Sequence, residues 1–93
     1  MIVGSAKITI HAPWVHSLKE KRMVVKSLCA KTRNKFNVSI AEVEEQDIHQ
    51  IAVLGISTVS TDMRQTESIL DEVVRFIEGS TEGEITNIER EIY

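Results

Sequence analysis

The chain has 93 residues, of which 42% are hydrophobic and 27% are charged, and its net charge is −3 at neutral pH. These values are ordinary for a soluble globular protein, so we expect residues 1–93 to form a single domain. No segment approaches the roughly 18 apolar residues of a membrane span, and the N-terminal segment lacks the pattern of a signal peptide. The lone cysteine, Cys29, excludes an internal disulfide. Together these features predict a cytoplasmic protein without a membrane partner.

The N-terminal half begins with an expected strand and continues with an expected helix. Polar and apolar side chains alternate over residues 2–11, which predicts a half-buried strand. Pro13 interrupts this pattern because it has no backbone donor. Ser17 and Glu20 then have the spacing of a capping box, in which each residue satisfies a free N–H at the helix start. A helix is therefore expected from about residue 18 to residue 36.

Two strands, a second helix and a last strand are expected after residue 37. Strands are expected over residues 38–43 and 50–60, joined by a polar connection. A second helix is expected between Asp62, as its N-cap, and Gly79, just past its end. A last strand is expected over residues 84–93. The order β-α-β-β-α-β contains two split βαβ units, and right-handed crossovers place both helices on one face of a four-stranded antiparallel sheet.

Positive charge is concentrated in residues 16–36, the region of the first expected helix. This stretch contains seven of the eleven Lys and Arg residues and one acid, Glu20, for a net charge of +6, whereas the rest of the chain carries −9. The seven cations are Lys19, Lys21, Arg22, Lys26, Lys31, Arg33 and Lys35. A positive helix on an acidic protein indicates a surface that meets an anionic partner.

The arrangement of these cations around the helix predicts where that partner binds. Lys19, Arg22, Lys26 and Arg33 fall within about 60° of one another at 100° per residue, and we call them the cationic row. Lys31 and Lys35 lie on the opposite flank of the apolar arc. Lys21 falls inside that arc, where we expect its side chain to extend past the core.

The start of the helix is a candidate site for one phosphate. Free backbone N–H groups and the positive end of the helix dipole attract anions there. Ser17, Lys19, Lys21 and Arg22 would surround such an anion.

A structural alternative accounts for the same charges without a ligand. The second helix carries four acids that can pair with a neighbouring basic helix, which would leave the positive helix neutralised within the molecule. They are Glu67, Asp71, Glu72 and Glu78.

The sheet face away from the helices is a second candidate surface. Val3, Ile51, Val53 and Val59 are expected there, and together they suggest a homodimer or protein interface. Simple β-propensity on a partly wet face explains them equally well. None of the four aromatic residues lies in the middle of a strand, so we do not expect the sheet to stack RNA bases.

Trp14 lies in the connection before the basic helix. Its indole either covers an edge of the core or presents an exposed anchor to a partner.

Catalytic and metal-binding patterns are weak in this chain. His11 and His16 are five residues apart across a loop, which matches no standard ligand spacing, and His49 is isolated. The acids of residues 42–47 lack the arrangement of a calcium loop. No nucleophile elbow or phosphate-binding glycine loop is present. We therefore expect no enzyme activity, metal, cofactor or small-molecule substrate.

Several segments resemble the YlxP-like family of small bacterial proteins. They are the segment H-S-L-K-E-K-R over residues 16–22, the segment R-N-K-F-N-V-S-I-A-E-V over residues 33–43, Leu54-Gly55-Ile56, and Ser60-Thr61-Asp62. The resemblance implies a ferredoxin-like α+β fold and supplies no catalytic residues. Genes of this family commonly lie beside genes for translation initiation and ribosome maturation.

The combined expectation is a non-enzymatic accessory factor that binds ribosomal RNA or a ribosome-assembly protein. Phosphates would contact the cationic row, with Ser17 and Lys21 holding one phosphate at the helix start. The competing expectation is a protein-interaction module that dimerises through the open sheet and binds no nucleic acid.

Overall fold

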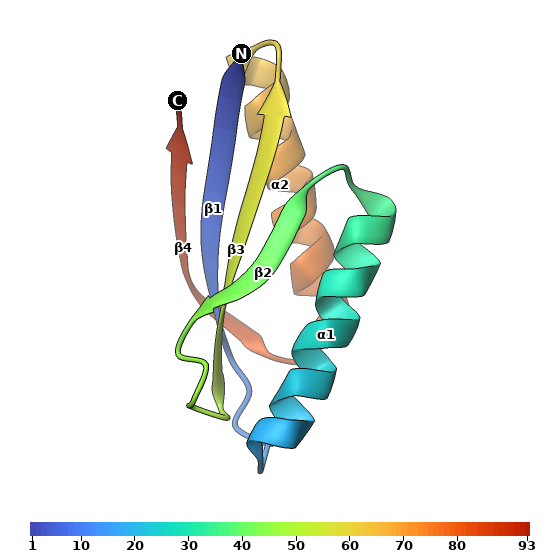
Figure 1. Ribbon diagram of the computed structural model, residues 1–93, viewed down its shortest axis with the longest axis vertical. Helices are drawn as coiled ribbons and strands as arrows, with labels where there is room; N and C mark the ends of the chain where they lie inside the picture. Colours follow the sequence, from blue (N-terminus) through green and yellow to red (C-terminus); the bar gives the residue numbers. More distant parts are fainter.

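Four strands form one sheet, and two helices cover the same face of it (Figure 1). The computed structural model describes residues 1–93. The elements are β1 Ile2–His11, α1 Leu18–Lys35, β2 Ser39–Glu44, β3 Ile51–Ser60, α2 Met63–Ser80 and β4 Glu84–Ile92. The strand order is β2-β3-β1-β4, and every neighbouring pair is antiparallel. The predicted ferredoxin-like α+β fold is confirmed.

The alternation of β1 determines which side of the sheet the helices cover. Ala6, Ile8 and Ile10 are buried, whereas the intervening residues are half-buried. Across the central pair, Ile8 lies opposite Leu54 and Ala6 lies opposite Ile56, so apolar side chains of β3 share this face. Buried residues of both helices complete the core against them.

The helix starts follow the predicted capping residues with one change. The Ser17 Oγ accepts a hydrogen bond from the Glu20 N–H at 3.1 Å, but the Glu20 carboxylate accepts from the His16 N–H rather than from Ser17. Asp62 caps α2 by accepting from the Gln65 N–H at 2.7 Å. The predicted role of Gly79 is wrong, because α2 continues through Ser80 and Gly79 does not adopt a positive φ.

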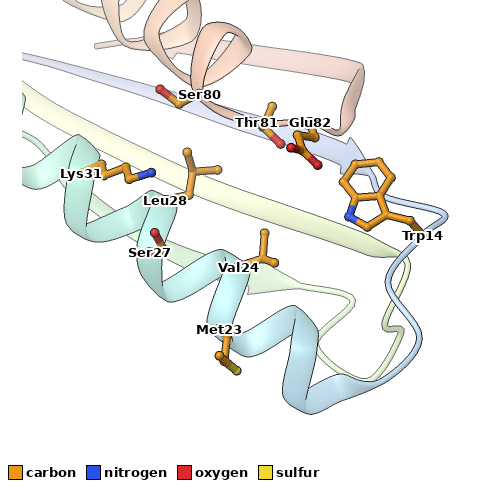
Figure 2. Close-up of a pocket in the computed structure, with 9 residues that line it drawn as sticks. All are labelled: Trp14, Met23, Val24, Ser27, Leu28, Lys31, Ser80, Thr81 and Glu82. Carbon is orange, nitrogen blue, oxygen red and sulfur yellow. The ribbon is translucent and has the colours of Figure 1, made fainter.

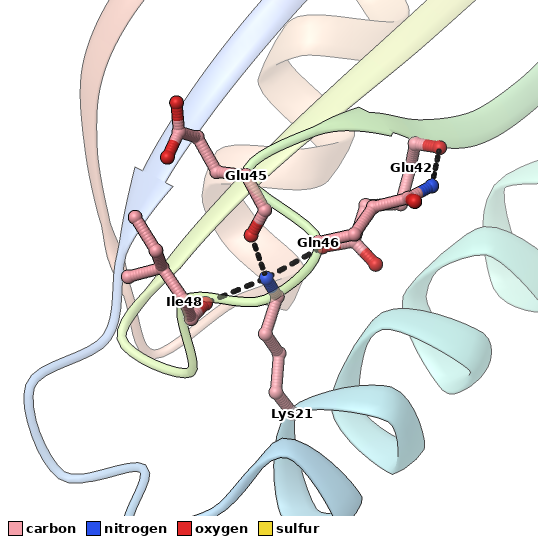
Figure 3. A network of polar contacts seen from close by, with 5 residues as sticks. All are labelled: Lys21, Glu42, Glu45, Gln46 and Ile48. Atoms are coloured by element: carbon pink, nitrogen blue, oxygen red, sulfur yellow. Dashed lines mark hydrogen bonds and ion pairs between the residues drawn. The ribbon is translucent and has the colours of Figure 1, made fainter.

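Lys21 is buried, which corrects its expected position on the surface. Only 3% of the residue is exposed, and Nζ forms an ion pair with Glu42 Oε2 at 2.7 Å (Figure 3). Nζ also donates to the main-chain oxygens of Glu45 at 2.6 Å and Ile48 at 2.7 Å. The two main-chain oxygens accept hydrogen bonds from the ammonium group, and the Glu42 carboxylate supplies the opposite charge beside it. Lys21 thus joins the first turns of α1 to β2 and the β2–β3 connection.

Replacing Lys21 with methionine should destabilise the fold strongly. The Lys21→Met variant keeps most of the apolar stem but leaves Glu42 buried without its cation, and breaking a buried pair in this way costs about 3–5 kcal/mol. Urea unfolding monitored by circular dichroism measures this loss. Lys26→Met, on an exposed position of the same helix, should change the free energy of unfolding by less than about 0.5 kcal/mol. Equal losses of stability in the two variants would contradict the structural role of the buried Lys21–Glu42 pair.

A methyl group at Gly4 should destabilise the contact between β1 and α2. An added Cβ would overlap Thr66 Cγ2 and lie 3.3 Å from Leu70 Cδ1, and such overpacking typically costs about 1–3 kcal/mol. Gly79→Ala is the matched control, because nothing lies within 4 Å of its added Cβ. In a helix that control should stabilise by up to about 1 kcal/mol. Thermal unfolding should therefore move in opposite directions for the two variants, and a shift in the same direction would contradict the packing.

Candidate nucleic-acid interface on the first helix

The cationic row lies exposed along the flank of α1 that faces β2. Lys19, Arg22, Lys26 and Arg33 are all exposed, and none has a carboxylate within 4.0 Å. The Arg33 Nη2 donates to the Ile40 carbonyl of β2 at 3.4 Å, which shows that this flank lies next to β2. The structure therefore brings these four predicted residues together on one surface with free charges.

The opposite flank of α1 continues the positive surface toward α2. Lys31 and Lys35 are exposed and have no ion-pair partner. The Lys35 Nζ lies 5.2 Å from the centroid of the Phe76 ring, within the range of a cation–π contact. This contact orients the side chain without neutralising its charge.

The acids of α2 do not neutralise α1. Asp71 pairs instead with Arg90 of β4 at 2.7 Å, and no ion pair joins the two helices. The alternative in which the basic helix is charge-paired with α2 is therefore not what the structure contains. Apart from buried Lys21, the cations of α1 remain available to an external anion.

The expected phosphate site at the helix start is not assembled as predicted. The Ser17 hydroxyl accepts from the Glu20 N–H, so it is already engaged in the cap. The Glu20 carboxylate lies at the same helix start, where it accepts from the His16 N–H. Lys21 points inward to Glu42. Only Lys19 and Arg22 remain of the charged groups expected there.

The open face of the sheet does not form the expected apolar patch. Val59 is 61% exposed and Val3 and Ile51 are half-buried, but Val53 is only 3% exposed. The outward exposure expected for Val53 is therefore wrong. The register of β2 shifts between Glu42 and Glu44, and the side chain of Val43 folds over Gly55 on the same face of β3. This irregularity covers β3 close to Val53.

The centre of the open face is polar. Lys7 Nζ lies 2.8 Å from Glu44 and 3.4 Å from Glu89, so this side chain of β1 reaches across β3 to β2 and also contacts the neighbouring β4. Hydrogen bonds raise the pKa of Lys7 above its ordinary value, and the bond to Glu44 has a larger effect than the bond to Glu89. These charges are solvated and separate Val3 and Val59 from Ile51.

A groove lies between α1 and the C-terminal end of α2, with Trp14 at one end (Figure 2). Its volume is about 350 Å³. The lining side chains are Trp14, Met23, Val24, Ser27, Leu28, Lys31, Ser80, Thr81 and Glu82. Trp14 is 38% exposed, so its indole both covers the groove and remains accessible. Trp14 was recognisable from the sequence, but this groove was not, because residues 80–82 are remote from α1 in the chain.

The remaining reactive groups offer little chemistry. Cys29 is buried, and burial raises the pKa of its thiol, which disfavours the nucleophilic thiolate. No three His, Cys, Asp or Glu side chains gather where they would hold a metal ion. Neither helix is both long and apolar enough to cross a membrane.

Comparison with solved structures supports the fold alone. A de novo designed protein, Foldit4, aligns with 99% of this chain and 94% of its own at a TM-score of 0.52, with 15% sequence identity. Such low identity carries no information about function.

Comparison of sequences establishes the family. The chain is 47% identical over 70 residues to the uncharacterized protein YlxP of Bacillus subtilis (strain 168), covering 75% of this chain and 76% of that protein. Residues 3–90 match the model of a family described as "Protein of unknown function (DUF503)". The match spans both helices and almost the whole sheet, and the YlxP-like resemblance is confirmed. The chain belongs to the DUF503 family.

Proposed function

We propose that this protein is a non-enzymatic RNA-binding accessory factor that contacts RNA phosphates through the cationic row. One observation carries the proposal: four exposed cations share one flank of α1, and no carboxylate of the chain neutralises them. Binding a polyanion there breaks no internal ion pair. The protein therefore needs little internal rearrangement to bind.

The charge distribution supports a single orientation on the RNA. Residues 16–36 carry +6, while the rest of the chain carries −9. The field of such a molecule attracts a polyanion to α1 and repels it from the acidic remainder. Lys31 and Lys35 extend the favourable potential across the helix toward α2.

Phosphate contacts of this kind position a protein without identifying a base sequence. We therefore place the specificity of the proposed complex in the shape of the RNA or in a protein partner. Ribosomal RNA or a ribosome-assembly protein is the partner that the gene neighbourhood of YlxP-like proteins implies. The choice of this partner rests on gene neighbourhood alone and not on any residue of this chain.

Dimerisation through the open sheet is the weaker alternative. Val53 is buried within the subunit, and Lys7 with its two glutamates occupies the centre of that face. A dimer there would have to desolvate these charges, which opposes association.

Charge reversal on α1 should abolish most of the proposed RNA affinity. The variant is Arg22→Glu/Arg33→Glu, two exposed arginines eleven residues apart on one flank. A natural control exists on α2, where Arg64 and Arg75 are exposed with the same spacing and changing both to Glu gives the same net charge. We expect at least a tenfold loss of affinity for single-stranded RNA in the α1 variant, measured by fluorescence anisotropy, and a much smaller loss in the control.

The salt dependence provides an independent measurement on the same proteins. Four phosphate contacts predict a slope of about −3 for a single strand in a plot of log K against log salt concentration, and the α1 variant should lose about half of that slope. A flat response in the unmodified protein would reject the proposal. Equal losses in the α1 variant and its α2 control would show only a general effect of net charge, and would also reject it.

A further inference from the structure

The groove beside α1 has an apolar floor and an aromatic end. Val24 and Leu28 face it from α1, and the Trp14 indole closes one end (Figure 2). Met23, which is 66% exposed, lies at the rim. The chain provides no hydrogen-bond acceptor for the Trp14 indole N–H. An aromatic ring with a free donor at the end of an apolar groove is suited to a flat, polar-edged ligand.

The two ends of the groove differ in charge. Figure 2 shows Glu82 and Thr81 beside Trp14, whereas Lys31 lies toward the other end. Val24 and Lys31 are seven residues apart on α1, which is roughly 10 Å along the helix axis. The groove thus has a carboxylate and an aromatic ring at one end and a free ammonium group at the other.

We propose that this groove accepts one unstacked base of a single-stranded RNA, with the base against Trp14 and a neighbouring phosphate at Lys31. The inference rests on the proposed function, because the RNA backbone reaches the groove from the cations of α1. The base end fits the groups present there, since the base can stack on the indole face while Glu82 accepts from its exocyclic amine. The carboxylate would repel a phosphate at that end, so the orientation is determined.

The size and charge of the groove favour a nucleotide as the occupant. Its volume of about 350 Å³ lies near the lower limit for small-ligand sites, roughly 300–1,000 Å³, so it fits one nucleoside unit. Six free cations lie on the exposed surface of the helix that forms one wall: Lys19, Arg22, Lys26, Lys31, Arg33 and Lys35. This charge is complementary to a polyanionic strand. Bases of a duplex are stacked and cannot enter, so the ligand is single-stranded.

Trp14 is the only tryptophan in the chain, so its fluorescence reports on the groove directly. The probes are a single-stranded oligoadenylate RNA and inorganic polyphosphate, which is a polyanion without bases. We expect the oligoadenylate to quench the emission of the unmodified protein at saturation and polyphosphate to bind without quenching. Trp14→Ala should weaken oligoadenylate binding roughly 5- to 150-fold, from about 1–3 kcal/mol per stacked base. Trp14→Phe should lose less, and polyphosphate affinity should not change in either variant.

The possible results separate this inference from the proposed function. If oligoadenylate binds with the expected salt dependence but neither quenches Trp14 nor responds to Trp14→Ala, the base site is overturned and the cationic row stands. If neither probe binds, both proposals are overturned. If an acidic amphipathic peptide changes the Trp14 emission and oligoadenylate does not, the groove is a protein-docking site and the inference is wrong. Quenching in the unmodified protein does not depend on the folding of any variant.

Discussion

The buried ammonium group of Lys21 is the contact on which the placement of α1 depends. Its Nζ joins Glu42 of β2 and the main-chain oxygens of Glu45 and Ile48, so it connects the helix to the edge of the sheet and to the following loop. Together with the buried side chains of Leu28 and Cys29, these contacts oppose rotation of α1 about its axis and so determine which of its flanks meets solvent. The positions of the cationic row and of the groove both follow from this orientation.

Two kinds of cation therefore coexist on one helix. Lys21 is buried and paired with Glu42, so it is part of the structure, whereas the other cations of α1 are exposed and have no ion-pair partner. The remaining ion pairs lie elsewhere: Lys7 with Glu44 and Glu89 on the open face, and Arg90 with Asp71. Acidic side chains outside α1 thus satisfy other partners or remain in solvent, and the positive potential of α1 is not cancelled locally. Exposed pairs contribute little to stability, so this arrangement leaves the fold nearly unaffected.

Local patterns were sufficient to predict the element order, since the alternation of β1 and the caps at Ser17 and Asp62 involve neighbours in the chain. The angular position of Lys21 was also predictable, but its partners are 21 to 27 residues away, and only the folded chain brings them together. Val53 was misplaced: it is buried next to the irregular pairing of β2, and the sequence has no signal for that register shift. The groove was not predictable because its lining includes Trp14 and Glu82, which lie near opposite ends of the chain.

A titration followed by two-dimensional NMR tests the central claim most directly, namely that α1 presents its free cations to a single-stranded RNA. With labelled protein and an oligoadenylate, we predict chemical-shift changes along residues 18–35 and at the indole N–H of Trp14. The amides of the open sheet face around Ser57 and Val59 should remain unchanged. Shift changes confined to that sheet face, or none at saturating RNA, would contradict the account.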